Sequence, residues 1–240
     1  MQVSTMRWID RWAGVPACAM LTLWRKATGL LRPADDAPVR RMLFVKLAEQ
    51  GSTVLACSAL REAVERVGRE NVFFIAFEEN RFILDVMEII PRENVVAIPA
   101  GGAAPLAMGL LRAIRPLRRL HIDAAIDLEF FARSSAILSY LSGARSRVGY
   151  HAYFGEARYR GDLMTHRVSF NPHWHASDMF RLLVLALDAP PARFPALDRV
   201  PPPSSELPAF APAVEEVEAV RAILRDLTGR ADLPPLILLN

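Results

Sequence analysis

The sequence has few cysteines and almost no net charge beyond its first residues, and each shortage excludes a class of protein. Two cysteines in 240 residues are too few for a disulfide framework, so we expect a reducing cytoplasm. Residues 1–41 hold seven basic and three acidic residues, whereas residues 42–240 hold 22 basic and 23 acidic ones. The charge therefore indicates no nucleic-acid surface. The hydrophobic share of 52% excludes a disordered chain.

The N-terminal segment has an uncharged stretch of 13 residues, from Trp12 to Trp24. Crossing a bilayer takes roughly 20 apolar residues, so this stretch is too short to span one. Trp8 and five basic residues lie around it: Arg7, Arg11, Arg25, Lys26 and Arg32. Two interpretations stay open. The segment is an amphipathic helix in the membrane interface, which would place a cytoplasmic protein on the inner face of the cytoplasmic membrane, or it is a helix docked on the protein body.

From residue 41 onward, short apolar runs alternate with segments of helical periodicity. Such alternation is typical of a parallel sheet covered by helices, so the expected class is α/β with a Rossmann-like sheet. The expected strands are 42–47, 71–77, 95–98, 124–128, 147–150 and 166–170. The expected helices are 54–67, 81–90, 106–119, 132–142, 175–187 and 214–228.

Proline marks a boundary late in the chain. Eight prolines fall between Ala189 and Pro212, which neither a helix nor a central strand tolerates. Beyond them, Leu236–Asn240 has the pattern of the first strand of another unit, so we expect a longer protein. The expected division is a membrane-interfacial helix and tether over 1–40, an N-terminal Rossmann-like acceptor domain over 41–188, a Pro-rich linker over 189–213 and the start of a C-terminal donor domain over 214–240.

The loop Leu47–Thr53 follows the first predicted strand, at the sheet edge where open α/β folds bind ligands. With Gly51 as its one glycine, it matches neither the dinucleotide fingerprint nor the phosphate loop, which weakens an oxidoreductase interpretation. Ser52 or Thr53 is expected to cap the following helix, whose free amides could also hold an anion. Glu49 is the loop's carboxylate and either accepts a substrate proton or is simply solvated.

Asp127 and Glu129 end the fourth predicted strand, where alternate side chains share a face and two carboxylates could converge on one cleft. Arg133 follows closely and could pair with one of them instead. His173 and His175 lie in a loop without a recognisable metal-ligand frame, so we expect packing or substrate contacts and no metal. The arginines on helix 106–119 form either a solvated face or a surface for a phosphate-rich partner; they are Arg112, Arg115, Arg118 and Arg119.

Several motifs, in their order and spacing over about residues 42 to 240, resemble glycosyltransferase family 9, which includes the lipopolysaccharide heptosyltransferases. They are Leu43–Leu47 with Gly51 and Ala59-Leu60, Asp123–Leu128, Leu141–Tyr150, Asn171–His175 and Ile237–Asn240. The resemblance implies a GT-B fold, in which two Rossmann-like domains face a cleft. It also implies an inverting transfer, with the acceptor on the N-terminal domain and a nucleotide sugar, typically ADP-heptose, on the C-terminal domain.

On this basis we expect a bacterial, membrane-associated glycosyltransferase that needs no cofactor and builds lipopolysaccharide or another cell-surface glycan. Residues 1–240 alone are expected to be inactive. The alternative is a non-catalytic member that binds glycan or serves as a scaffold. The expected substrate contacts are Lys46, Gly51, Ser52, Thr53, Glu129, His173 and His175.

One position departs from the family pattern. The resemblance implies an aspartate after Gly51 as general base, but Ser52 stands there, and a serine hydroxyl does not accept a proton at neutral pH without another base. Glu49 or Asp127 takes the role, or the acceptor differs, or activity is lost. The sequence leaves these alternatives open.

Overall fold

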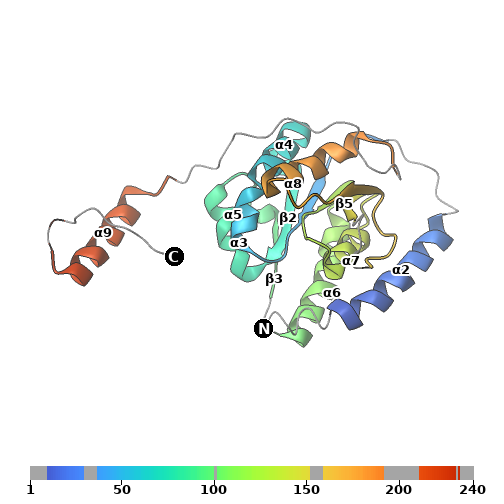
Figure 1. Cartoon of the computed structure of the whole chain (residues 1–240), viewed down its shortest axis with the longest axis horizontal. Coiled ribbons are helices and arrows are strands. Elements are labelled where there is room, and N and C mark those ends of the chain that lie inside the picture. Colours follow the sequence, from blue (N-terminus) through green and yellow to red (C-terminus); the bar gives the residue numbers. More distant parts are fainter. Residues whose placement is uncertain are drawn as a thin grey trace. The chain divides into compact units, whose positions relative to one another are not determined.

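Six parallel strands form one sheet in the first of two units into which the chain divides, Met1–Pro208 and Ala209–Asn240 (Figure 1). The computed structural model describes residues 10–29, 37–99, 102–151, 159–191, 211–230 and 232. The strands are β1 Met42–Val45, β2 Val72–Phe77, β3 Val95–Ile98, β4 Ala124–Asp127, β5 Ser146–His151 and β6 His166–Ser169. Their order is β3-β2-β1-β4-β5-β6, and all neighbours are parallel. The predicted parallel α/β sheet is confirmed.

The central strand β1 is buried on both faces. Phe44 lies in register with Phe74 of β2 and Ile126 of β4. Successive side chains of a strand point to opposite faces, so Phe44 packs into one core while Leu43 and Val45 pack into the other. Such a strand appears in the sequence as a continuous apolar run and shows no alternation.

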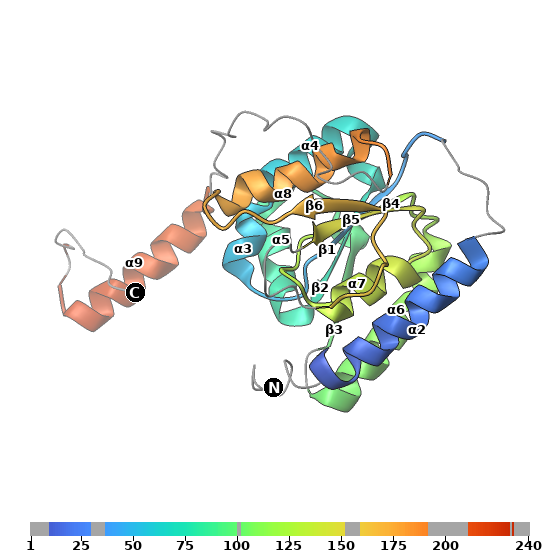
Figure 2. The same cartoon turned by 45° about the vertical axis from the view of Figure 1, so that its right-hand side comes forward.

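Helices cover both faces of the sheet (Figure 2). The larger core lies under α4 and α8, and the other lies under α6 and α7. Among the described residues of this unit, the helices are α2 Gly14–Gly29, α3 Gln50–Leu55, α4 Cys57–Val67, α5 Arg81–Met87, α6 Ala103–Arg119, α7 Arg133–Leu141 and α8 Ala176–Leu185, with 3-10 turns η1 Arg69–Asn71, η2 Glu78–Asn80, η3 Arg92–Asn94 and η4 Ala186–Asp188.

The prediction of one helix over 54–67 was wrong in its start and in its continuity. The chain becomes helical at Gln50, and α3 and α4 are separated at Ala56, which has φ −77° and ψ 0°. The first turn of α3 is polar, so apolar periodicity could not reveal it.

The described part of the second unit contains α9, Val214–Thr228, with the bounds that the sequence predicted. The helix begins where the Ala213 amide donates to the Glu216 carboxylate at 2.9 Å and ends at Gly229, which has φ 65°. The predicted strand 236–240 and linker residues 192–210 lie outside the described residues. The four-part domain division therefore stays a prediction.

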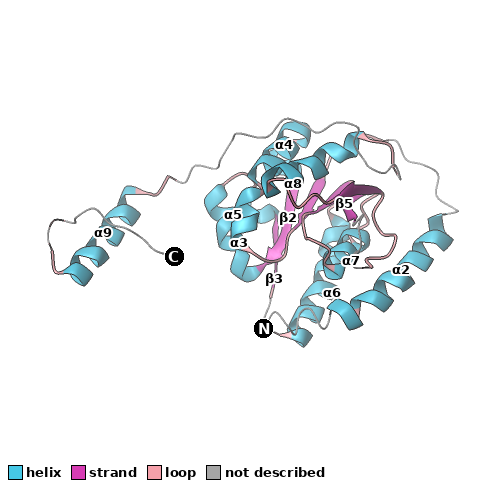
Figure 3. Ribbon diagram, viewed as in Figure 1, coloured by secondary structure: helices cyan, strands magenta, loops and turns pink. Residues whose placement is uncertain are grey.

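Helix α2 lies against α7 (Figure 3). Cys18 is fully buried, and a side chain at Gly14 would come within 2.8 Å of Arg133 Cβ. Asp10 caps the start of α7: its carboxylate accepts from the amides of Arg133 and Ser134 at 2.9 and 3.1 Å and pairs with the Arg133 guanidinium at 3.0 Å. The interpretation of a helix docked on the body is confirmed. None of the helices in the described ranges has the length and hydropathy of a membrane span.

Replacing Asp10 tests this docking. Asp10→Ala removes the cap of α7 and leaves the largely buried Arg133 without its carboxylate, so we expect a loss of about 1–3 kcal/mol in the free energy of unfolding, measured by urea denaturation. Arg11→Ala is the control, because Arg11 is exposed, and it should change stability by less than about 0.5 kcal/mol. Equal effects of the two substitutions would contradict a specific docking.

Candidate functional site

The loops that follow β1 and β4 leave the sheet side by side at its carboxyl edge. The chain proceeds from β1 to β2 and β3 on one side, while β4, β5 and β6 extend the sheet on the other. Open parallel sheets bind their ligands at such a reversal of strand order, where neighbouring connections run to opposite faces and leave a crevice. This position makes the two loops the candidate site.

A buried lysine lies beneath the loop after β1. The Lys46 side chain is 0% exposed, and its ammonium group donates to the Ala48 carbonyl at 2.8 Å. It lies 3.5 Å from a carboxylate oxygen of each of Glu49 and Glu129. In this conformation Lys46 holds the loop from its buried side. Its predicted contact with a substrate stays a prediction.

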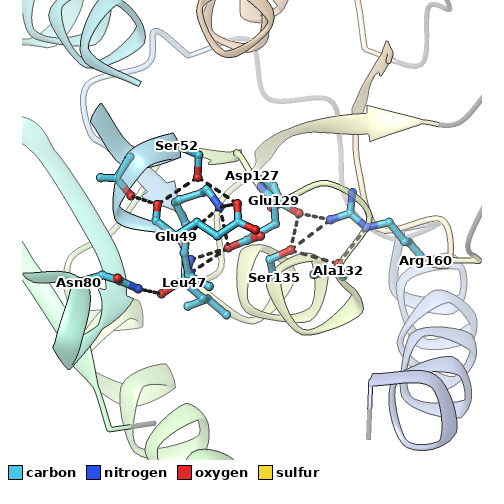
Figure 4. Close-up of polar contacts among 12 residues, drawn as sticks. Leu47, Glu49, Ser52, Asn80, Asp127, Glu129, Ala132, Ser135 and Arg160 are labelled. Carbon is cyan, nitrogen blue, oxygen red and sulfur yellow. Dashed lines mark hydrogen bonds and ion pairs between the residues drawn. The ribbon is translucent and has the colours of Figure 1, made fainter. Parts of the chain in front are cut away.

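Glu129 fastens the loop from the side of β4 (Figure 4). Its carboxylate accepts from the amides of Leu47 and Ala48 at 2.7 and 3.2 Å. On the other side, the buried Asn80 at the end of η2 donates to the Leu47 carbonyl at 2.7 Å. Polar groups from the ends of β2 and β4 therefore fix the backbone that carries Glu49.

Glu49 precedes α3 with φ 71°, a left-handed conformation that is uncommon for residues other than glycine. Its side chain is 69% exposed, and one carboxylate oxygen lies 3.1 Å from the Ser52 hydroxyl. The prediction of Ser52 or Thr53 as helix cap was wrong, because Glu49 occupies that position and both hydroxyls point back to its carbonyl. Gly51 precedes these two residues and is exposed in the first turn of α3.

Asp127, at the end of β4, is enclosed. Its side chain is 0% exposed and forms an ion pair with Arg160. The Ser135 hydroxyl donates to it at 2.9 Å and the Glu129 amide at 3.0 Å. The alternative in which Arg133 pairs with Asp127 or Glu129 is not seen, because Arg133 is held by Asp10.

Burial raises the pKa of Asp127 to about 6, against the opposing effects of Arg160 and of the hydrogen bonds from Glu129 and Ser135. A carboxylate so enclosed cannot reach a proton on a bound ligand unless the surrounding side chains move. The geometry therefore separates the two catalytic candidates: Glu49 is exposed, and Asp127 is a buried support of the loop beside it.

The two candidate histidines lie at the start of α8. His175 caps this helix by accepting from the Ser177 amide at 3.3 Å, and His173 follows a turn stabilised by Asn171. Ser177 lies 3.0 Å from the Ser58 hydroxyl of α4, which places this loop near the start of α4. Among the described residues, no group of three or more histidine, cysteine, aspartate and glutamate side chains could hold a metal ion.

Two residues that shape the site, Asn80 and Arg160, were not among those predicted from the sequence. Asn80 follows a predicted strand at the carboxyl edge, and this position could have indicated it. Arg160 lies in an irregular segment, in a chain with 27 arginines, and no local pattern distinguishes it. Besides Asp127, it contacts the carbonyls of Ala132 and Tyr150 at 3.0 and 3.3 Å.

Comparison with solved structures identifies the class of fold. The chain superposes on the Escherichia coli ADP-heptose lipopolysaccharide heptosyltransferase II with a TM-score of 0.55 and 17% identity, covering 77% of this chain and 50% of that one. It superposes on a family 9 glycosyltransferase from Veillonella parvula with a TM-score of 0.57 and 18% identity, covering 83% and 52%.

The sheet and its helices therefore have the fold of part of these glycosyltransferase structures, and the resemblance drawn from the sequence motifs is confirmed for the fold. The chain spans about half the length of these two structures. No protein-family model matches the chain, and no curated protein sequence is significantly similar to it.

The raised pKa of Asp127 predicts a particular pH dependence of stability. Its carboxyl group keeps its proton to about pH 6 in the folded protein, compared with 3.8 as the ordinary value. Between these values the folded state binds more protons than the unfolded state, so this group's contribution to stability falls as pH rises, with a slope of at most about 1.4 kcal/mol per pH unit.

Urea denaturation at pH 4, 5, 6 and 7 would measure this contribution as the stability difference between the parent and Asp127→Asn. We expect the difference to fall from about pH 4 to about pH 6 and to level off above. A difference that rises over the same window would mean that Arg160 outweighs burial and that the folded pKa lies below its ordinary value.

Proposed function

We propose that the chain forms the acceptor side of an inverting glycosyltransferase of family 9, which moves a heptose-like sugar from a nucleotide-sugar donor to lipopolysaccharide or another cell-surface glycan. The fold supports this, because one similar structure is an ADP-heptose lipopolysaccharide heptosyltransferase. The family-like motifs of the sequence support it independently. The observation that carries the proposal is the exposed Glu49 carboxylate, 3.1 Å from the Ser52 hydroxyl, in the loop where the family pattern implies the general base.

Glu49 is the general base in this mechanism. It removes the proton of the acceptor hydroxyl as that oxygen attacks the anomeric carbon of the donor sugar. The bond between the anomeric carbon and the diphosphate breaks at the same time, and the nucleoside diphosphate leaves with the electron pair. Attack from the face opposite the leaving group inverts the configuration.

The other candidate residues serve this carboxylate or the acceptor. Lys46 and Glu129 set the path of the loop, because Lys46 donates to the Ala48 carbonyl and Glu129 accepts from the Leu47 amide. Asp127 supports Glu129, because its carboxylate accepts a hydrogen bond from the Glu129 backbone amide. Gly51, Ser52 and Thr53 form the first turn beside Glu49, and the exposed His173 and His175 contribute acceptor contacts from the α8 side.

The donor is a nucleotide sugar such as ADP-heptose, held by a second domain of which residues 214–240 form the start. Residues 1–240 alone therefore do not transfer sugar, and the reaction needs no cofactor. Because such an acceptor is membrane-bound, the protein works in the cytoplasm at the inner face of the cytoplasmic membrane.

A second function is favoured by one specific observation. Serine replaces the aspartate that the family pattern implies after Gly51. If Glu49 does not accept the acceptor proton, the same loop serves a non-catalytic protein that binds glycan or acts as a scaffold.

Neutralising Glu49 separates the two functions. In the complete protein, Glu49→Gln keeps the side-chain size but removes the proton acceptor, so we expect turnover of a nucleotide sugar to fall about 10²- to 10⁴-fold with little change in donor binding. The measurement is release of nucleoside diphosphate together with isothermal titration of the donor. The control is Glu70→Gln, an exposed glutamate near the amino end of β2, which should leave turnover unchanged.

Two further variants sharpen this test. Ser52→Asp should restore part of the turnover in the Glu49→Gln background, because it returns a carboxylate to the neighbouring position. If Glu49→Gln keeps turnover within a few-fold while Asp127→Asn abolishes it without unfolding the protein, the base lies on β4. A complete protein that binds glycan and transfers no sugar supports the non-catalytic function.

A further inference from the structure

Two helices on one side of the sheet expose apolar and basic faces that the proposed reaction does not use. Figures 1 and 2 show α2 and α6 on the side of the sheet away from α4 and α8. The cores agree with this arrangement, because α6 and α7 share one core and α2 packs on α7. The outward faces of α2 and α6 therefore belong to one helical layer.

The outer face of α2 is mostly apolar. Met20, Leu23 and Trp24 are 65%, 70% and 64% exposed and, at 3.6 residues per turn, fall within an arc of about 100°. Trp12, in the helical turn just before α2, is 63% exposed. The inner face, by contrast, carries Cys18 and Thr22, which are buried. A helix docked on a soluble protein normally turns charged and polar side chains to the solvent, whereas the exposed side of α2 is mostly apolar and carries Lys26 as its one exposed charged residue.

The outer face of α6 combines apolar and basic residues. Met108 and Leu111 are 49% and 63% exposed. The helix has no acidic residue from Ala103 to Arg119. Its exposed arginines are Arg112, Arg115, Arg118 and Arg119. Of these, Arg112, Arg115 and Arg119 form no ion pair with any residue that the structure describes.

We propose that the outer faces of α2 and α6 together form a surface that binds an anionic lipid bilayer, with the apolar face of α2 in the interface and the arginines of α6 on lipid phosphates. Trp12 lies just before α2 and Trp24 lies in its second half, and tryptophan prefers the headgroup level of a bilayer. A helix lying in the interface is stabilised by its buried apolar area and by attraction of basic side chains to anionic lipid.

Charge decides between this partner and a second copy of the chain. Two copies meeting through this layer would bring together two sets of arginines with no carboxylate on α2 or α6 to neutralise them. Lipid phosphates supply the missing negative charge. This surface specifies which two helices, α2 and α6, would bind the membrane in the proposed location. Its binding does not depend on whether the protein transfers sugar.

The surface also fixes an orientation. Asp10 caps the start of α7, and α7 follows the β4 loop that carries Glu129, so α2 begins at the carboxyl edge of the sheet. Trp12 therefore lies toward the edge that holds Glu49. Binding through this layer turns the outer faces of α2 and α6 to the membrane, with the edge that holds Glu49 on the side of Trp12.

Vesicle flotation of the purified full chain tests the proposal. We expect it to float with vesicles of phosphatidylcholine containing phosphatidylglycerol and far less with phosphatidylcholine alone. The triple variant Arg112→Gln, Arg115→Gln, Arg119→Gln should lose about 10- to 100-fold in partitioning to the anionic vesicles. Trp12→Ser with Trp24→Ser should weaken binding to both kinds of vesicle.

Matched controls use the opposite helical layer and the strand ends. Arg69→Gln, Arg81→Gln and Arg92→Gln remove the same charge elsewhere, and Phe82→Ser removes an apolar side chain that is 67% exposed on α5; neither should change flotation. Thermal melting confirms that each variant is folded. No flotation of the parent, equal loss in the controls, or a concentration-dependent dimer that the α2 substitutions abolish would overturn the proposal. None of these measurements involves a nucleotide sugar.

Discussion

The buried ion pair between Asp127 and Arg160 is the contact on which the candidate site depends. A carboxylate with no exposure to water is costly unless its partners compensate it. Here compensation comes from three directions: Arg160, the Ser135 hydroxyl and the Glu129 amide. Because Arg160 also contacts the carbonyls of Ala132 and Tyr150, one guanidinium connects β4, the start of α7 and β5.

The effect of this pair extends from the interior to the surface in two further steps. Asp127 fixes the backbone of Glu129, and the Glu129 carboxylate holds the amides of Leu47 and Ala48. The next residue is Glu49, whose positive φ directs the chain sharply into α3. A left-handed conformation at a glutamate costs of order 1 kcal/mol or more and persists only where the surroundings enforce it. The buried charges and the exposed carboxylate are thus parts of one arrangement.

The sequence predicted the centre of the sheet because β1, β2 and β4 are buried throughout and almost entirely apolar. The more polar strands β5 and β6 were predicted from shorter patterns. The strand 95–98 was predicted exactly, and the others differ only at their ends. The sequence predicted where the site residues lie in the fold, but it did not predict which side chains they contact. Asp127 and Glu129 could be placed at a strand end, but the partner of Asp127 lies 33 residues further on, in a segment without periodicity. Long-range side-chain pairs of this kind leave no signal in one sequence.

The N-terminal helix shows why the two interpretations of its sequence are compatible. Docking uses one narrow face of α2. On this face Gly14 lies close to Arg133, and the buried Cys18 packs against α7. Membrane binding needs the opposite face, which carries the tryptophans. Because a helix presents both faces at once, the docked position does not compete with the lipid. It holds the apolar face at a fixed angle to the sheet edge that carries Glu49, which a flexible anchor could not do.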